Sequence, residues 1–389
     1  MKALFIANGI SATNGVPGVS GGDLRWLSVA KVWQNQGVEV HVLTTDAGRE
    51  FCRRFGLEAE IHSFGSLSGV GKVAYIDRGL HAWSIPSDLR GFEGLIYSTT
   101  ELIYDVIPGS KMRRRNPANR LGVVSHWVAP MVRQNTSLLN SLMFYANNRA
   151  GLRYANRYAD VLFGVSGPTK RSMVSEVHIP EDRIIEVACG VDYPAIQAAT
   201  TSTQKFYDAV FMKRLEGTKG IWDLLRIWKK VVEARPGSKL LVLGGGSQET
   251  ISRIKAELEA NGISDNVTLY GPVYDFDKKF SLLAQSKTFV LPTYEENWAI
   301  VIGEALAAGL PVMCYDLPEI RPVWEDSITW VPKGNIEGFA QAILRFLDDP
   351  SQRSLRSEQG RRFVQRYDWE EIGQKELTAL LSTLTVADK

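Results

Sequence analysis

The stretch FVLPTYEENWAIVIGEALAAGLPV, residues 289–312, indicates how this chain folds. An apolar run at 288–292 is typical of a buried strand, and the apolar residues at 298–308 have helical spacing. A Gly-Leu-Pro sequence then ends the helix before another apolar run at 311–315. A strand, a helix and a strand in this order predict a βαβ unit of a parallel sheet.

The same alternation continues on both sides of this stretch, and a polar break at 198–204 divides it into two series. Before the break, a helix is predicted at 22–36 and strands at 2–7, 38–44, 94–98, 121–127 and 161–165. After the break, strands are predicted at 206–212, 239–243, 267–270, 288–292 and 311–315, with helices at 219–234, 248–261, 276–285 and 298–308.

This order predicts an α/β chain with two Rossmann-like domains, each a wound parallel sheet. Residues 1–200 form the first predicted domain and residues 201–389 the second. Three helices are predicted in the tail at 335–385, and we expect them to pack back towards the first domain. Ligands of such domains bind at the carboxyl ends of the strands, so the default site is a cleft shared by the two domains.

Composition excludes several classes of protein. The 389 residues are 44% hydrophobic and 23% charged, which is typical of a globular chain and not of a disordered one. Lys and Arg number 45 against 43 Asp and Glu, so the net charge of +2 argues against a strongly basic nucleic-acid binder. The three cysteines, Cys52, Cys189 and Cys314, are too far apart for a disulfide framework or a zinc motif, which favours a reducing compartment.

The chain shows no targeting or membrane-spanning pattern. Its first apolar run has five residues, too few for the core of a signal peptide, and no run approaches 18 apolar residues. We therefore expect a cytoplasmic protein, free or peripheral on the inner face of the cytoplasmic membrane.

Two strand-to-helix turns have the residues of an anion site. The loop after the first strand ends in Gly21 and Gly22 at a helix start, where backbone N–H groups can bind a phosphate; a plain surface loop is the alternative. The pattern G-x-G-x-x-G is missing there, which weakens a nicotinamide-dinucleotide interpretation. In the second domain, Arg214 and Lys219 flank the first such turn, either as phosphate ligands or as solvated surface cations.

Together these residues resemble the retaining glycosyltransferases of family 4, which have the GT-B architecture of two facing Rossmann-like domains. The family's Glu-x7-Glu motif matches Glu296 and Glu304, and other matches are Arg214, Lys219, Gly220, Gly21, Gly22 and His126. Weaker matches are Gly190–Asp192, Gly244, Gly246, Gly271–Val273, Pro318–Ile320 and Trp369.

The resemblance implies a nucleoside-diphosphate sugar, of UDP or GDP type, held mainly by the second domain. Arg214 and Lys219 would neutralise the diphosphate, helped by the amides of Gly21 and Gly22, so no metal and no other cofactor would be required. Glu304 would bind the ribose and Glu296 the sugar hydroxyls, while His126 would line the reacting centre or be a structural histidine. The remaining implied donor contacts are Gly244, Val273, Asn297, Trp298, Ala299 and Ile300.

Two departures from the family limit what the resemblance implies: the first leaves the donor sugar open, and the second leaves the shape of a loop open. Asn297, Trp298 and Ala299 stand where the family usually has Gly-Phe-Gly, and Asp316-Leu317 replaces a Gly-Gly pair. Glu295 offers an alignment shifted by one residue, but Glu296 alone gives the eight-residue step to Glu304.

The acceptor side is predicted from charge in the first domain. Residues 101–150 contain seven Lys or Arg against two acidic residues, and Arg149, Arg153 and Arg157 share one predicted helix face. A basic cluster made of Lys111, Arg113, Arg114 and Arg115 could meet an anionic membrane surface or a lipid-linked phosphate acceptor; a solvated basic loop is the alternative. No nucleic-acid recognition motif accompanies these charges.

We therefore expect a metal-independent retaining glycosyltransferase that acts on a glycan or lipid-linked acceptor, in exopolysaccharide or lipopolysaccharide synthesis. The alternatives are a GT-B nucleotide-sugar 2-epimerase and a catalytically silent, nucleotide-binding GT-B subunit. The other histidines, His41, His62, His81 and His178, match no family pattern and receive no role.

Overall fold

The computed structural model describes residues 1–13, 16–63, 72–133, 137–200 and 204–385. The chain folds into two compact units. Unit 1 contains Met1–Gly190 and Trp369–Lys389, and unit 2 contains Val191–Asp368.

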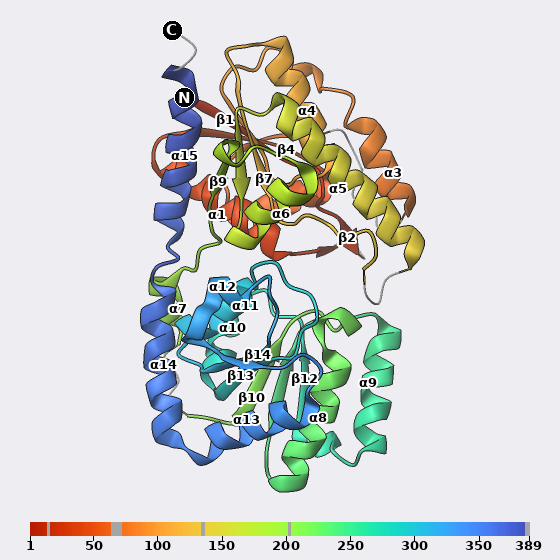
Figure 1. Ribbon diagram of the computed structural model, residues 1–389, viewed down its shortest axis with the longest axis vertical. Helices are drawn as coiled ribbons and strands as arrows, with labels where there is room; N and C mark the ends of the chain where they lie inside the picture. Colours follow the sequence, from red (N-terminus) through yellow and green to blue (C-terminus); the bar gives the residue numbers. More distant parts are fainter. Residues whose placement is uncertain (14–15, 64–71, 134–136, 201–203, 386–389) are drawn as a thin grey trace. The chain divides into compact units, whose positions relative to one another are not determined.

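Unit 1 is built on a sheet that has, in the described residues, seven parallel strands in the order β5-β4-β1-β6-β7-β8-β9 (Figure 1). The strands are β1 (Lys2–Ala7), β4 (Glu39–Thr44), β5 (Glu60–Ser63), β6 (Leu95–Ser98), β7 (Arg120–Ser125), β8 (Val161–Gly164) and β9 (Ile184–Glu186). The central strands are buried on both faces, which explains their continuous apolar runs. A short antiparallel pair, β2 (Ala12–Thr13) and β3 (Val16–Pro17), follows β1.

Helices cover this sheet, and several of them begin at a capping side chain. Ser20 and Asp23 form a capping box at the start of the first helix, which stabilises its N-terminus. The helices are α1 (Gly21–Asn35), α2 (Asp46–Arg54), α3 (Lys72–His81), α4 (Ile103–Arg115), α5 (Leu138–Tyr158), α6 (Gly167–Val177) and α15 (Trp369–Thr385), with 3-10 turns at Ser87–Leu89 and Glu181–Arg183.

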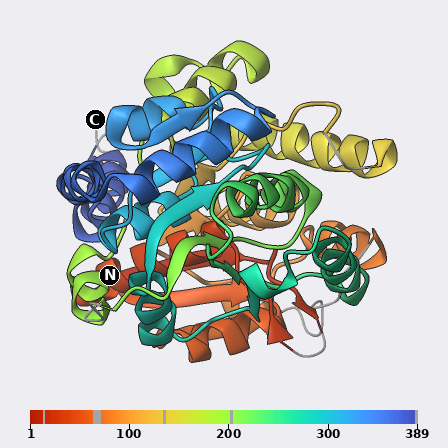
Figure 2. The same ribbon diagram turned by 90° about the horizontal axis from the view of Figure 1, so that it is seen from below.

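Unit 2 has a second parallel sheet, six-stranded in the described residues, in the order β12-β11-β10-β13-β14-β15. The strands are β10 (Tyr207–Met212), β11 (Leu240–Leu243), β12 (Val267–Gly271), β13 (Ser286–Leu291), β14 (Val312–Tyr315) and β15 (Thr329–Val331). The helices are α7 (Tyr193–Ala199), α8 (Ile221–Ala234), α9 (Gln248–Ala260), α10 (Phe276–Ala284), α11 (Ile300–Ala307), α12 (Arg321–Trp324), α13 (Ile336–Asp348) and α14 (Pro350–Val364). On one face α8, drawn green, packs beside α13, drawn blue (Figure 2).

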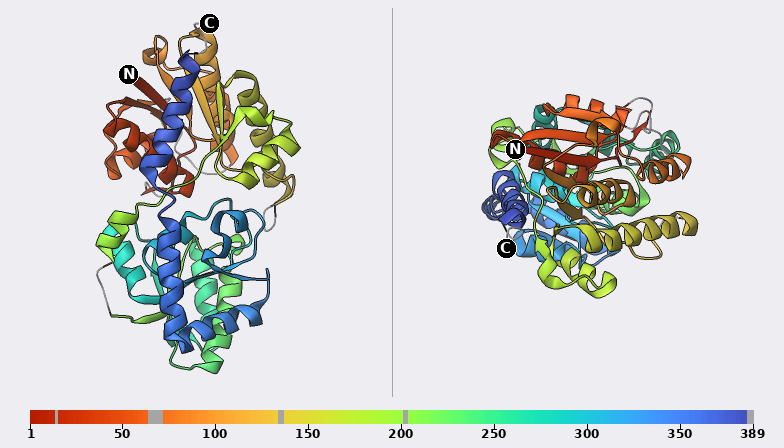
Figure 3. Two further views of the ribbon diagram at one scale, coloured as in Figure 1. Left: turned by 60° about the vertical axis from the view of Figure 1, so that its left-hand side comes forward. Right: turned by 90° about the horizontal axis from the view of Figure 1, so that it is seen from above.

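The division of the chain differs from the predicted division at residue 200. The first unit ends at Gly190, because α7 packs on α10 and α11 of unit 2. The last helix, α15, belongs to unit 1, where it packs along α1 and the strands (Figure 3). A buried ion pair between Arg25 and Glu376 joins the two helices, and Trp33 Nε1 donates to the Gly373 carbonyl at 2.8 Å.

Three outer strands, β5, β9 and β15, were not predicted. Each has only three or four residues and at most two aliphatic side chains, so none of them forms the long apolar run that marks an inner strand. None of the helices in the described parts of the chain is both long and apolar enough to cross a bilayer.

Both sheets reverse their winding at a central pair of strands. In unit 1 this switch point lies between β1 and β6, and in unit 2 it lies between β10 and β13. Helices leave such neighbouring strands on opposite faces, which opens a crevice at their carboxyl ends. The loops after these four strands are therefore where ligands are expected.

Candidate functional site

A buried carboxylate between two lysines lies at the switch point of unit 2. Glu296 follows β13, and its side chain is 6% exposed. Lys213, which follows β10, donates to it at 2.9 Å, and Lys219, at the end of the next turn, donates at 3.1 Å. Two cations that share one carboxylate leave a net positive charge at the carboxyl end of the sheet.

Burial and charge act on this cluster in opposite directions. Burial by itself would raise the pKa of Glu296, but the charges of Lys213 and Lys219 outweigh it and hold that pKa below its usual value. Burial also lowers the pKa of Lys213, against the attraction of Glu296. Glu296 is thus a carboxylate, which only accepts hydrogen bonds.

The loop that carries Glu296 is fixed by hydrogen bonds from three directions. Tyr294 OH donates to Asp223 of α8 at 2.6 Å, and its backbone N–H donates to the Thr218 carbonyl at 2.9 Å. Lys219 Nζ also donates to the Glu295 carbonyl at 2.6 Å. Gly220 has a φ of 79°, and a Cβ there would lie 1.7 Å from the Pro292 carbonyl oxygen, so only glycine permits this approach.

The second glutamate of the motif, Glu304, lies on α11 with its side chain 12% exposed. It accepts a hydrogen bond from Lys279 of α10 at 2.8 Å. The ammonium group of Lys279 also lies 4.4 Å from the centroid of the Phe280 ring. Glu304 is therefore a second paired carboxylate, joined to a lysine that the sequence did not single out.

The residues between the two glutamates form the start of α11. Ala299 is left-handed, with φ 61°, and its side chain cannot cap the helix. The Ile302 N–H donates to the Ala299 carbonyl at 2.8 Å, whereas the N–H groups of Ile300 and Val301 have no capping side chain. The Trp298 ring is buried against Trp324 and Tyr367, with centroids 4.6 and 4.9 Å away, which makes the side chain part of the core. Asn297 is half-buried.

Two further predicted positions lie in neighbouring loops. Gly244 follows β11, and a Cβ there would lie 1.8 Å from the Lys213 carbonyl oxygen. The loop after β11 therefore packs directly on the residues that follow β10. Val273 is half-buried in the loop between β12 and α10.

Arg214 lies in the setting of a solvated surface cation, which was one of its two predicted settings. Its side chain is 68% exposed and forms an ion pair with Glu216 at 2.9 Å. The cation that joins Lys219 on Glu296 is instead its neighbour Lys213. Adjacent residues at a strand end point to opposite faces, so the sequence could not say which of the two faces the carboxylate.

At the switch point of unit 1 and the end of the neighbouring strand β7, the loops bring together a histidine and two buried carboxyl groups. His126 follows β7, and its Nε2 lies 3.0 Å from the Thr99 carbonyl oxygen, so this nitrogen carries the proton. Its backbone N–H donates to the Glu101 carboxyl at 2.9 Å. A Cβ on Gly22 would lie 3.4 Å from the His126 ring, so this glycine brings the start of α1 close to the ring, with Gly21 beside it as the first helical residue.

Burial is the largest influence on the pKa values of His126, Glu101 and Asp105. Burial and the positive charge of Arg25 lower the pKa of His126 to about 4, so the imidazole is neutral at pH 7. Burial raises the pKa of Glu101 to about 7 and that of Asp105 to about 8. Asp105 accepts from the Asn8 N–H at 2.7 Å, directly after β1.

The basic cluster lies in the last turns of α4, and part of it is engaged in the fold. Arg113 donates to both oxygens of Asp160, at 2.8 and 3.0 Å, and Lys111 donates to the Trp83 carbonyl. Arg114 and Arg115 are exposed. On α5, Arg149 is buried and pairs with Glu176, whereas Arg153 and Arg157 are exposed, so the three arginines do not share one solvent face.

Sequence reasoning missed four polar groups of these two switch points: Lys213, Lys279, Glu101 and Asp105. Glu101 and Asp105 come soon after the strand predicted at 94–98, and a polar residue at the carboxyl end of a strand was the signal that could have identified them. One group of described side chains has the composition of a metal site, namely His41, Glu60 and His62 in unit 1.

Comparison with known proteins places this geometry in context. Residues 192–363 match a family described as Glycosyl transferases group 1. The O-antigen chain mannosyltransferase B of Escherichia coli is 25% identical over 54% of this chain and 58% of that protein. The phosphatidyl-myo-inositol mannosyltransferase of Mycobacterium leprae is 28% identical over 45% of this chain and 46% of that protein.

The whole chain resembles solved structures more fully than curated sequences. The Anabaena HepE protein in complex with UDP and glucose superposes with a TM-score of 0.75, at 16% identity, over 98% of this chain and all of that one. The matches to the first four curated relatives span between 15% and 58% of their lengths. Residues 192–363 therefore match the group 1 glycosyl transferases, within a chain whose two parallel-sheet units have the GT-B fold.

Proposed function

We propose that this chain is a retaining glycosyltransferase that moves a sugar from a nucleoside-diphosphate sugar to a glycan or lipid-linked acceptor. The observation that carries the proposal is the buried Glu296 between Lys213 and Lys219 at the switch point of unit 2. This cluster lies within the region that matches the group 1 glycosyl transferases.

The donor's phosphates would bind where unit 2 presents positive charge. Lys219 and the exposed Arg214 can each donate charge-assisted hydrogen bonds to the diphosphate. The available amides at the start of α11, from Asn297 through Trp298 and Ala299 to Ile300, add a helix N-terminus. In unit 1, the amides of Gly21 and Gly22 at the start of α1 are of the same kind.

The sugar and the nucleoside would bind to the acceptor groups of unit 2. Glu296, held as a carboxylate, suits the hydroxyls of the donor sugar, and Glu304 suits those of the ribose. The base would lie by Gly244 and Val273, in the loops after β11 and β12. A UDP- or GDP-sugar is the proposed donor.

In the transfer step, the bond between the sugar C1 and the phosphate oxygen breaks, and the acceptor oxygen bonds to C1 on the same face. The leaving diphosphate takes the acceptor's proton. Because charge develops on the diphosphate, preorganised cations are the main catalytic contribution, and lysine and arginine can supply it without a metal. His126, neutral at pH 7, would orient the sugar or the acceptor by hydrogen bonding and not by its charge.

The acceptor would be a surface glycan or its lipid-linked precursor, in exopolysaccharide or lipopolysaccharide synthesis. The support is that relatives include an O-antigen mannosyltransferase and phosphatidyl-myo-inositol mannosyltransferases. The proposed location is the cytoplasm, with peripheral binding to the inner face of the membrane.

An apolar stripe beside the basic cluster supports contact with lipid. Val73, Ile76 and Leu80 on α3 are 82, 53 and 67% exposed, and α3 packs against α4, which ends in Arg114 and Arg115. Apolar side chains next to cations fit an anionic bilayer surface. Leu80→Glu together with Ile76→Glu should abolish co-sedimentation with vesicles that contain anionic lipid; unchanged binding would count against this contact.

The first experiment is a thermal-shift screen against UDP, GDP, ADP, CMP and their sugar conjugates, followed by a transfer assay with the donor that binds. A ligand that prefers the folded state raises the melting temperature. The shift should be lost in Lys219→Ala and kept in Lys230→Ala, which removes an exposed cation paired with Glu337. Binding without sugar transfer or release would favour the silent subunit, and a 2-epimer as product would favour the epimerase.

A further inference from the structure

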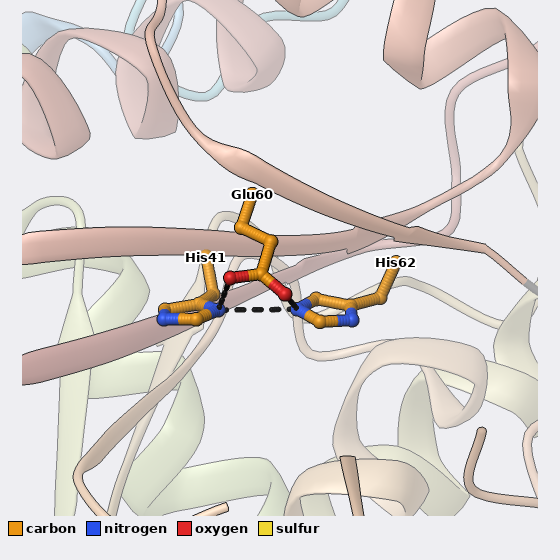
Figure 4. Close-up of side chains that lie close together, drawn as sticks. All are labelled: His41, Glu60 and His62. Carbon is orange, nitrogen blue, oxygen red and sulfur yellow. Dashed lines mark hydrogen bonds and ion pairs between the residues drawn. The ribbon is translucent and has the colours of Figure 1, made fainter. Parts of the chain in front are cut away.

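A group of histidines and carboxylates on the outer strands of unit 1 has no part in the proposed reaction. His41 lies on β4, and Glu60 and His62 lie on the neighbouring edge strand β5. The register pairs His41 with Glu60, and His62 follows Glu60 by two residues, so all three side chains lie on one face of the sheet. Figure 4 shows the two rings with the Glu60 carboxylate between them.

The hydrogen bonds of the two rings leave an electron-rich gap between them. His41 Nε2 lies 3.0 Å from a Glu39 oxygen, and His62 Nδ1 contacts Asp88. A carboxylate only accepts, so each of these outer nitrogens carries a proton. In neutral rings the two inner nitrogens, His41 Nδ1 and His62 Nε2, are then unprotonated, yet they face each other at 3.1 Å.

Glu60 adds negative charge to the same gap. Its two oxygens lie 3.5 Å from His41 Nδ1 and 3.8 Å from His62 Nε2. Two lone pairs and a carboxylate around one point require a cation there, either a shared proton or a metal ion. The histidine side chains are 5% and 3% exposed, so water cannot readily separate them.

The distances favour a metal ion. Two imidazole nitrogens bound to one tetrahedral Zn²⁺ at about 2.0–2.1 Å lie roughly 3.3–3.4 Å apart. The inner nitrogens are 3.1 Å apart and the nearer carboxylate oxygen is 3.5 Å away, so small movements would complete three corners of a tetrahedron.

The surrounding residues have the arrangement that orients metal-binding histidines. Such a histidine usually donates its other N–H to a carboxylate, which fixes the ring and raises its basicity. Glu39 and Asp88 occupy these positions, and Phe92 packs edge-on against His41 at 5.6 Å. The site therefore has both a ligand set and its outer support.

We propose that His41, His62 and Glu60 bind a divalent transition-metal ion, Zn²⁺ by preference, with a water molecule in the fourth position. Two histidines and a carboxylate suit zinc better than the harder cations Mg²⁺ and Ca²⁺, which prefer oxygen ligands. The ion would tie the edge strand β5 to β4 and stabilise that edge of the sheet. Because its residues lie outside both switch points, this site is independent of the proposed transfer.

The test uses the full chain, stripped with a chelator and dialysed against zinc. We expect about one tightly held zinc ion per chain by elemental analysis, together with a rise in melting temperature that the chelator reverses. With Co²⁺ in place of zinc, the protein should show the visible absorption of a tetrahedral Co²⁺ site. Less than a tenth of an equivalent of zinc retained would overturn the proposal and leave a shared proton in the gap.

Matched variants locate the ion. Glu60→Gln changes a side chain that is 64% exposed, so folding is preserved while zinc affinity should fall at least tenfold. Asp88→Asn, outside the ligand set, should weaken binding by about 10- to 100-fold. Asp77→Asn is the control, because Asp77 also lies next to a histidine, 3.2 Å from His81, but away from the proposed site. This variant should bind zinc as tightly as the parent chain. Zinc affinity that is equal in all of these variants would place the ion elsewhere and overturn the proposal.

Discussion

The two switch points of this molecule have the same topology and different electrostatics. In unit 2, the buried Glu296 is ionised because Lys213 and Lys219 surround it. In unit 1, the equally buried Glu101 is bonded to neutral donors, the His126 N–H and the Asn148 amide, and burial raises its pKa to about 7. The two crevices thus differ in charge: under the proposed function, the cationic one would bind the charged diphosphate and the nearly neutral one would bind hydroxyls.

The largest expected effect is a loss of transfer rate when one lysine of the unit 2 cluster is removed. Lys219→Ala takes a cation from the proposed leaving group, and losing one such preorganised donor costs about 10²- to 10³-fold in rate. Steady-state transfer assays with the donor found in the thermal-shift screen measure the loss. Lys230→Ala should retain full activity, and a Lys219→Ala enzyme within threefold of the parent would contradict the proposed role.

Neutralising the two carboxylates separately compares the crevices directly. Glu296→Gln leaves two lysines, each less than one-fifth exposed, without their anion, and we expect a loss of about 3–5 kcal/mol in unfolding free energy. Glu101→Gln keeps one accepting oxygen and leaves one neutral donor unpaired, so it should cost about 1–2 kcal/mol near pH 6, less than Glu296→Gln. Denaturant titrations measure both values, and equal losses would refute the comparison.

The two carboxylates should also give opposite pH dependence of stability. A carboxyl whose pKa is raised on folding binds its proton more tightly in the folded state, so its contribution is present below pH 4 and declines as the pH rises. For Glu101, with a pKa of about 7, the decline spans roughly pH 4.5 to 7. Glu296, whose pKa is lowered, contributes above its unfolded value and loses that contribution as the solution is acidified.

This pH effect can be measured with the same variants. Compared with the parent chain, Glu101→Gln should gain about 2 kcal/mol in relative stability between pH 5 and 8, because it lacks the titrating proton. The stability deficit of Glu296→Gln should instead shrink as the pH falls below the ordinary pKa of a glutamate, because the parent chain then loses the contribution of its carboxylate. Parallel curves for the parent and Glu101→Gln across this range would show that the Glu101 pKa is unshifted.

The smallest expected effect concerns the backbone at the start of α11. Ala299 has a left-handed φ of 61°, which costs an L-residue about 1 kcal/mol and glycine nothing. Ala299→Gly should therefore change stability by less than about 1 kcal/mol, while Ala299→Val should destabilise the chain by more than that. Thermal unfolding measures both variants, and a neutral Ala299→Val would mean that the conformation is not strained.

The sequence predicted the inner strands of both sheets because each contains an uninterrupted run of apolar residues, such as ALFIA in β1 and LLVL in β11. It could not predict β5, which has one aliphatic residue and forms a strand because it pairs with β4. The pairing of His41 with Glu60 depends on the same register, which no local pattern encodes.

Site residues that belong to a motif with fixed spacing could be predicted from the sequence. Residues whose role depends on the direction of the side chain could not. Glu296, Glu304 and Lys219 follow from their spacing and their place next to strands. That Lys213 faces the carboxylate while Arg214 faces solvent depends on the twist at one strand end. The raised pKa values of Glu101 and Asp105 depend on burial by residues distant in sequence.

The return of α15 to unit 1 has a consequence for how the chain is made. Glu376, the partner of the buried Arg25, is synthesised after all of unit 2, because Val191–Asp368 is inserted within unit 1. A growing chain therefore completes its second unit before its first, against the usual order in which amino-terminal domains fold first. Until α15 leaves the ribosome, Arg25 lacks its partner Glu376. A chain cut before Trp369 would therefore leave a buried arginine of α1 without that partner, far in sequence from the cut.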